Sequence, residues 1–144
     1  MGKPSVLVTT DHPVLAIDHG TARIGLAATD DFALSIHPAG TLDAAGDPLT
    51  ELEKVVVTRK VQTLVLGLPL RLDGSEGDSS ARVREFADQL KERFPDLPLH
   101  FHDERFSTQT AAKNLRQAGK KARNQKEVID QAAAMEILRE FLGW

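Results

Sequence analysis

The chain reads Leu-Ala-Ile-Asp-His-Gly-Thr-Ala-Arg-Ile from Leu15 to Ile24. Two apolar runs, Val14 to Asp18 and Arg23 to Ala28, flank the short turn between them, and this pattern predicts a β-hairpin. Asp18 therefore lies where a buried strand meets a tight turn, which makes its carboxylate a candidate functional group. The alternative is that Asp18 only accepts hydrogen bonds from backbone N–H groups of the turn.

After the hairpin, the apolar pattern predicts alternating strands and helices. Ala33 to Thr41 supplies a third strand, and Thr63 to Leu68 is a continuous apolar run typical of a strand that is buried on both faces. Leu97 to Phe101 is a further short strand. Helices are predicted over residues 47–60, 79–93 and 126–142, with one more that begins after Ser107 as its N-cap. This order indicates an α/β fold that opens with three antiparallel strands.

Length and composition limit the classes of protein to consider. A chain of 144 residues predicts one domain, and residues 1–13 are interpreted as an N-terminal extension. The sequence has no cysteine, which excludes disulfides and thiolate metal sites. No apolar stretch approaches the roughly 20 residues of a membrane span, and the start lacks the apolar core of a signal peptide. We therefore expect a soluble, cytoplasmic protein without a membrane partner.

Charge is unevenly distributed along the chain. The net charge is −3, yet the 14 residues from Lys113 to Lys126 contain six basic residues and no acidic one. They are Lys113, Arg116, Lys120, Lys121, Arg123 and Lys126. One interpretation is a solvated helix end with Gly119 as its C-cap. The other is a patch that, together with Arg105, contacts nucleic-acid phosphates.

Three carboxylates from distant segments are predicted to converge. Asp18 ends the first strand, Glu104 follows the last strand, and Asp130 lies in the first turn of the last helix. A carboxylate at that helix position also stabilises the helix dipole, which is the simpler explanation for Asp130. However, Ala133 and Ala134 are small enough to let this helix approach the sheet closely. Such a cluster needs a cation, and Mg²⁺ or Mn²⁺ prefers oxygen ligands, so the pattern indicates metal-assisted phosphoryl transfer.

Four ordered motifs carry a resemblance to a known family. They are Asp18-His-Gly-Thr21 with Gly25, Gly67-Leu-Pro-Leu70 with Asp73-Gly-Ser75, Asp103-Glu-Arg-Phe-Ser-Thr108, and Asp130 with Ala132-Ala133. In this order and spacing, residues 14–142 resemble the YqgF/RuvX family of RNase H-like nucleases, which are related to the RuvC Holliday junction resolvases. The resemblance implies an RNase H-like fold with a five-stranded mixed sheet in the order 3-2-1-4-5, flanked by helices. It also implies a hydrolase that cleaves phosphodiester bonds with Mg²⁺ or Mn²⁺.

The resemblance assigns roles to single residues. Asp18, Glu104 and Asp130 would be the catalytic carboxylates and metal ligands. Asp103 is the alternative to Glu104, because adjacent side chains at a strand end point in opposite directions. His19 departs from the apolar or aromatic residue expected at its position, and we interpret it as an outward-facing histidine rather than a ligand.

Two further histidines alternate along the predicted strand at residues 97–101 and its end. His100 and His102 share a face there, but two imidazoles without a third partner are weak evidence for zinc.

Substrate and assembly stay open at this point. The family is associated with processing of the 5′ end of the 16S ribosomal RNA precursor, which would make pre-ribosomal particles partners, and with cleavage of branched DNA. A monomer would suit trimming of one RNA end, whereas a homodimer would suit paired cuts in a junction. Two alternatives to a nuclease are a non-catalytic RNA- or ribosome-binding module with the same fold, and an actin-like or sugar-kinase ATPase. The second would require another domain to enclose ATP, for which 144 residues are too few.

Overall fold

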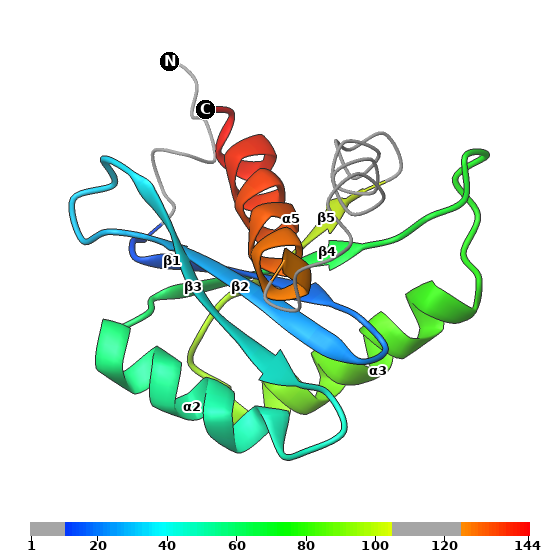
Figure 1. Cartoon of the computed structure of the whole chain (residues 1–144), viewed down its shortest axis with the longest axis horizontal. Helices are drawn as coiled ribbons and strands as arrows, with labels where there is room; N and C mark the ends of the chain where they lie inside the picture. Colours follow the sequence, from blue (N-terminus) through cyan, green and yellow to red (C-terminus); the bar gives the residue numbers. More distant parts are fainter. Residues whose placement is uncertain (1–10, 105–124) are drawn as a thin grey trace.

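A computed structural model describes residues 11–104 and 125–144 and contains a five-stranded mixed sheet (Figure 1). The strands lie in the order β3-β2-β1-β4-β5, as predicted. Their bounds are β1 (Val14–His19), β2 (Arg23–Thr29), β3 (Ile36–Asp43), β4 (Thr63–Leu68) and β5 (Leu99–Asp103). The first three strands pair antiparallel, whereas β4 is parallel to β1 and β5 is parallel to β4. The carboxyl ends of β1, β4 and β5 therefore meet at one edge of the sheet.

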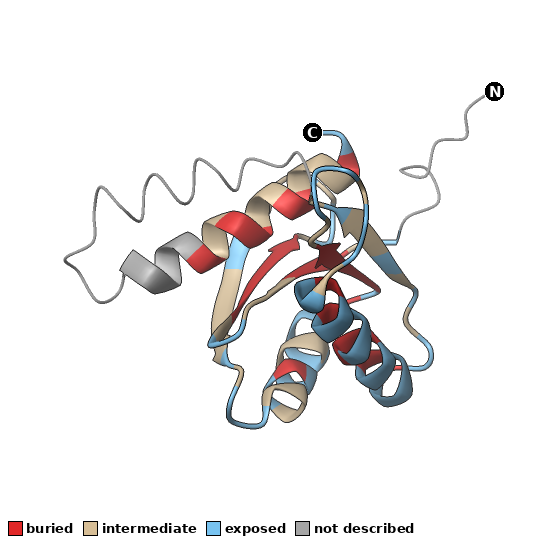
Figure 2. Ribbon diagram, turned by 90° about the vertical axis from the view of Figure 1, so that its right-hand side faces the viewer, coloured by how far each residue is buried: buried red, intermediate tan, exposed pale blue. Residues whose placement is uncertain are grey.

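Helices cover both faces of this sheet. Helices α2 (Pro48–Arg59) and α3 (Asp78–Arg93) pack on one face, and α5 (Gln125–Leu142) crosses the other (Figure 1). Figure 2 shows the buried strands in red between these two layers. The helices predicted over residues 47–60, 79–93 and 126–142 match the observed ones to within one residue at each end. Among the described residues, no helix is both long and apolar enough to pass through a membrane.

The central strand β1 follows from its sequence, because it is apolar at successive positions and can be buried on both sides. Leu15 and Ile17 pack in the core beneath α2 and α3. Val14 and Ala16 pack in the smaller core beneath α5. By the same alternation, Asp18 lies on the α5 face and His19 on the α3 face.

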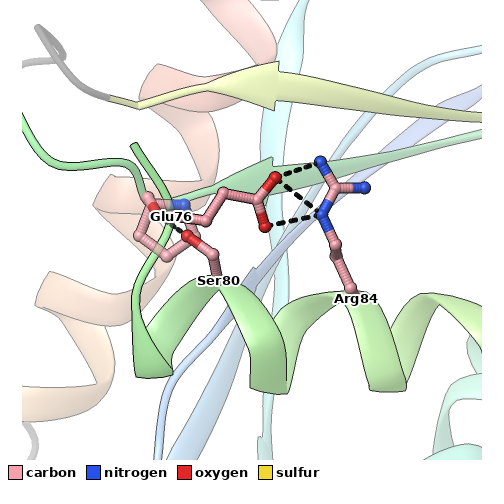
Figure 3. Close-up of polar contacts among 4 residues, drawn as sticks. Glu76, Ser80 and Arg84 are labelled. Carbon is pink, nitrogen blue, oxygen red and sulfur yellow. Dashed lines mark hydrogen bonds and ion pairs between the residues drawn. The ribbon is translucent and has the colours of Figure 1, made fainter. Parts of the chain in front are cut away.

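Hydrogen bonds and an ion pair hold the segment between β4 and α3 in place (Figure 3). The Ser80 hydroxyl, which is fully buried, donates a hydrogen bond to the Pro69 carbonyl. Arg84 donates from Nε and Nη2 to the Glu76 carboxylate at 2.6 to 2.9 Å (Figure 3). The Arg84 guanidinium also lies 5.1 Å from the centre of the Phe101 ring. These contacts hold the first turn of α3 beside the carboxyl end of β4.

Two strands differ from their predicted bounds. β3 begins at Ile36 rather than Ala33, because the Asp30 carboxylate accepts a hydrogen bond from the Leu34 N–H and Ala33 has a φ of 59°. This local turn replaces the first residues of the predicted strand. β5 runs from Leu99 to Asp103 rather than over 97–101, since the chain before Pro98 still turns out of α3. The helix predicted after Ser107 lies outside the described residues.

The end of the predicted N-terminal extension is bonded to the sheet. His12 Nδ1 lies 2.8 Å from Thr29 Oγ1, and the Thr63 hydroxyl donates to the Asp11 carbonyl over 2.8 Å. The Gln62 N–H donates to the Pro13 carbonyl over 2.9 Å. Residues 11–13 therefore attach to the body, while the single domain over 1–144 stays a prediction.

Candidate active site

Asp18, Glu104 and Asp130 line one cleft of about 280 Å³ at the carboxyl ends of the parallel strands. Arg23 and Arg82 line the same cleft. The three carboxylates come from β1, from the residue after β5, and from α5. The structure thus brings together the three acidic residues that the sequence analysis singled out.

Glu104 is the most perturbed acid of the group. Its N–H donates to the Leu68 carbonyl over 3.1 Å, which continues the pairing of β5 with β4. Its carboxylate lies over Gly67, where an added Cβ would overlap the Glu104 Oε2 atom. Burial raises the pKa of Glu104 to about 8, and the charges of Asp18, Glu140 and Asp103 add to this effect. Without a bound metal ion, Glu104 is therefore largely protonated at neutral pH.

Asp130 is buried and held by an ion pair. Its Oδ2 accepts a hydrogen bond from Arg23 Nε over 2.7 Å. The backbone of Asp130 packs directly on Gly25, where an added Cβ would overlap the Asp130 carbonyl. Ala133 and Ala134 are buried against the sheet, which confirms that small residues let α5 approach it.

Arg23 was missed by the sequence reasoning, although a signal was present. Gly25 pairs with Asp18 in the β1–β2 register, and Arg23 lies two residues before Gly25 on the same strand. Side chains two residues apart share a face of a strand, so the period of β2 places Arg23 on the face that carries Asp18.

The cleft supplies some of the carboxylate ligands that a hard divalent cation needs, but not all of them. Asp18 and Glu104 interact electrostatically and offer carboxylate oxygens, which Mg²⁺ and Mn²⁺ prefer. Asp130 could add a third carboxylate if Arg23 released it. As they stand, no three His, Asp or Glu side chains in residues 11–104 and 130–144 are grouped closely enough to hold a metal ion.

The structure distinguishes the two neighbouring acids of the Asp103-Glu104 pair. Asp103 is exposed at the end of β5 and does not line the cleft, whereas Glu104 does. The alternative assignment of Asp103 is therefore not favoured by geometry.

The histidines take three different positions. His19 is half-buried and its ring centre lies 4.6 Å from that of Phe86 in α3, so the prediction of an outward-facing side chain is wrong. Burial and, second, the charge of Arg82 lower the pKa of His19. His100 and His102 do share the α5 face, where His100 packs on Phe141 and His102 Nε2 lies 2.9 Å from Glu140 Oε1.

Most of the predicted phosphate-binding residues lie outside the described part of the chain. These are Arg105, Lys113, Arg116, Lys120, Lys121 and Arg123. Lys126 lies in the first turn of α5, and its side chain is also outside the described part.

The chain is similar to known proteins both in its sequence and in its fold. The sequence profile of RuvX, described as Holliday junction resolvase, matches residues 12–143. A protein of Cutibacterium acnes, provisionally named as a pre-16S rRNA nuclease, is 42% identical over 128 residues, which are 89% of this chain and 80% of that protein. A relative from Kineococcus radiotolerans with the same name is 40% identical, over 89% of this chain and 70% of its own.

Two solved structures share the fold at low sequence identity. T. thermophilus RuvC, in complex with a Holliday junction substrate, has a TM-score of 0.57 at 13% identity, covering 92% of this chain and 95% of its own. Fowlpox virus resolvase, in complex with Holliday junction DNA, has a TM-score of 0.50 at 10% identity, covering 90% of this chain and 92% of its own. At these identities the likeness shows the fold alone, which is of the RNase H-like class.

The profile match spans nearly the whole chain, and the relatives match it over most of their length. Nucleases and resolvases of this class are hydrolases that act on phosphodiester bonds, and they generally need divalent metal ions. This chain therefore belongs to the RuvX family of Holliday junction resolvases.

Proposed function

We propose that the cleft between β1, β5 and α5 is the active site of a divalent-metal-dependent nuclease, in which Asp18, Glu104 and Asp130 are the catalytic carboxylates. One observation carries this proposal. The Glu104 carboxylate is half-buried beside the charge of Asp18, in a cleft that Asp130 also lines. Burying acids together is unfavourable unless a cation compensates them, so the arrangement is more costly than packing alone would require.

The residues of the cleft would have different roles in phosphodiester hydrolysis. Bound Mg²⁺ or Mn²⁺ would lower the pKa of the attacking water and stabilise the leaving oxygen. Asp18 and Glu104 would supply oxygen ligands, with Glu104 giving up its proton when the metal binds. Asp130 would join them after separating from Arg23. The freed Arg23 guanidinium, together with Arg82, would then be placed to bind the phosphate of the substrate.

RNA is the substrate that the relatives favour. The curated relatives carry the name of a pre-16S rRNA nuclease, so we propose processing of the 5′ end of that precursor, on pre-ribosomal particles in the cytoplasm. Branched DNA is the second candidate, since the family is described by Holliday junction resolution. In both cases the predicted basic run from Lys113 to Lys126, with Arg105, would bind the backbone without sequence preference.

Cleavage of end-labelled substrates tests the proposal. The substrates are a 16S precursor fragment, an unstructured single-stranded RNA and a four-way DNA junction, each with Mn²⁺, Mg²⁺ or EDTA. We expect the wild type to cut in a metal-dependent way. Asp18→Asn should lower the cleavage rate by at least about a hundredfold, because it removes a metal ligand without changing the volume of the side chain.

Asp96→Asn is the matched control, since it removes the same charge from an exposed residue outside the cleft. It should leave cleavage within about twofold of the wild type. If the wild type and Asp18→Asn were equally inactive but both bound RNA, the chain would be a binding module and the nuclease proposal would fail. Sizing of the protein on a column would separate a monomer from the homodimer that paired cuts in a junction require.

A further inference from the structure

A second cavity of about 340 Å³ lies next to the active-site cleft, between the end of β1 and the helices α2 and α3. His19 and Arg82 line both spaces. Asp18 lies on the α5 face of β1 and His19 on the face that carries α2 and α3, because consecutive side chains of a strand point to opposite faces. The two spaces therefore adjoin at His19 and Arg82.

The walls of this cavity combine aromatic and aliphatic surface with polar and charged side chains. The rings of His19 and Phe86 lie against each other with an angle of 37° between their planes. Pro48 and Leu49, from the first turn of α2, add aliphatic surface, and Gln89 contributes an amide. Unpaired nucleobases are typically bound by stacking on aromatic side chains, with hydrogen bonds to their edges.

Side chains of both charges line the cavity. Arg82 is exposed and lies at the boundary with the active-site cleft. Asp47 and Glu85 line the cavity itself, and the Asp47 carboxylate already accepts hydrogen bonds from Thr50. A phosphate would be attracted to Arg82 and repelled by the two carboxylates. A base carries no net charge and can enter, and its amino groups can donate to Glu85.

We propose that this cavity, which we call the His19 cavity, binds the unpaired base of the nucleotide next to the scissile phosphate. His19 stacks on the base, and Arg82 holds the adjoining phosphate. This inference rests on the proposed nuclease function and adds a substrate class to it. A base inside a continuous duplex is stacked and paired, so the His19 cavity selects nucleic acid that is single-stranded beside the cut.

Fluorescence of 2-aminopurine, measured in EDTA, tests the inference without catalysis. The probe is a short single-stranded RNA that carries 2-aminopurine at one position in each of a set of oligonucleotides. We expect the wild type to quench the fluorophore at one position, and a complementary strand to remove that quenching. His19→Ala should lose the quenching and weaken binding about fivefold or more, since base stacking contributes roughly that much or more.

Two further variants test whether the aromatic ring of His19 itself causes the quenching and the binding. His19→Phe keeps an aromatic surface and should bind within about twofold of the wild type. His100→Ala removes the same side chain from the α5 side, where it packs on Phe141 outside the cavity, and should not change binding. Circular dichroism and thermal unfolding of each variant check that the fold is kept. If a folded His19→Ala protein quenched and bound like the wild type, the inference would be wrong.

Cleavage in Mn²⁺ separates this inference from the nuclease proposal. If the wild type cuts, His19→Ala should raise KM for single-stranded RNA about fivefold or more with little change in kcat. Unchanged KM in an active His19→Ala protein would overturn the base-binding inference while the nuclease stands. Quenching at one position by a wild type that never cuts would support base binding while the nuclease proposal fails.

Discussion

Gly67 lies beneath the Glu104 carboxylate, and Gly25 lies beneath the backbone of Asp130. Because glycine has no Cβ, each of these positions leaves space for the segment that packs directly on it. Neither has a positive φ, so space rather than backbone conformation explains the glycine at both positions. At the scale of single residues, the carboxylates can approach one another because these two side chains are absent.

Gly67→Ala tests this explanation. The added methyl would overlap Glu104 Oε2 and would also lie 2.7 Å from Ile137 Cδ1, so the carboxylate must move. We expect a loss of about 1–3 kcal/mol in the free energy of unfolding and at least tenfold weaker Mn²⁺ binding. Urea unfolding and calorimetric titration with Mn²⁺ measure the two effects.

Gly46→Ala serves as the control for this substitution. The nearest atom to its added Cβ is 3.7 Å away, in ordinary contact distance. We expect both stability and Mn²⁺ binding to stay close to those of the wild type. Equal Mn²⁺ affinity in Gly67→Ala and Gly46→Ala would show that the position of Glu104 does not matter for the metal.

The raised pKa of Glu104 predicts how stability depends on pH. In the folded protein this pKa is about 8, against an ordinary value of 4.5, so the folded state holds one more proton than the unfolded chain between these two values. The contribution of Glu104 to stability is fully present below pH 4.5 and is lost as the pH rises through 8. In EDTA, the free energy of unfolding should fall by up to about 1.4 kcal/mol per pH unit in this window.

Glu104→Gln isolates that contribution, because the amide has the shape of the carboxyl group and no charge. Urea unfolding at several pH values from 5 to 8 should give a smaller slope for this variant than for the wild type. Glu92→Gln, an exposed position on α3, should keep the wild-type slope. Identical slopes in the wild type and Glu104→Gln would mean that Glu104 is ionised in the folded protein.

At the scale of elements, α5 is the helix that completes the cleft. An ion pair between Asp130 of α5 and Arg23 connects this helix to the sheet. Arg23 belongs to β2 and Asp130 to α5, and their side chains are 33% and 12% exposed. Two further polar contacts join α5 to the sheet: Gln131 Nε2 donates to Thr41 Oγ1, and His102 Nε2 lies 2.9 Å from Glu140 Oε1. Apolar residues such as Ala134, Ile137 and Leu138 pack on the sheet as well. The ion pair therefore sets where Asp130 lies more than whether α5 docks.

The substitution Arg23→Gln should separate the positioning of Asp130 from the docking of α5. It leaves the Asp130 carboxylate in a partly buried position without its cation, so we expect a loss of about 1–2 kcal/mol in EDTA. A divalent cation should restore part of that loss if it takes over the Asp130 carboxylate. Thermal unfolding in EDTA and in Mn²⁺, repeated for Asp130→Asn, gives the comparison. No recovery with Mn²⁺ would argue that Asp130 is a structural partner of Arg23 rather than a metal ligand.

At the scale of the whole molecule, topology explains why the site lies where it does. β1 joins an antiparallel half of the sheet to a parallel half, and the carboxyl ends of the parallel strands open at one edge. In α/β sheets such edges are where ligands bind. At this edge α3 lies on one face of the sheet and α5 on the other (Figure 1). Both the cleft and the His19 cavity border the end of β1.

Much of this fold could be predicted because its signals are local. The apolar run of β4 was placed at Thr63–Leu68, as observed. The helix predicted over residues 79–93 is present as α3, and the apolar residues of one of its faces are buried: Val83, Phe86, Ala87 and Leu90. The strand order was implied by family resemblance. The predicted strand starts at Ala33 and Leu97 were wrong because a local turn occupies each position: Leu34 N–H donates to the Asp30 carboxylate, and Leu97 N–H donates to the Phe94 carbonyl.

The sequence by itself determined the elements and the three acidic candidates, because periodicity and motif spacing lie along the chain. The tertiary structure alone decided that Glu104 and not Asp103 enters the cleft, that Arg23 pairs with Asp130, and that His19 packs on Phe86. These outcomes depend on strand register and on contacts between residues far apart in the chain. A side chain's partner and its burial are fixed by packing across such contacts, which no local pattern encodes.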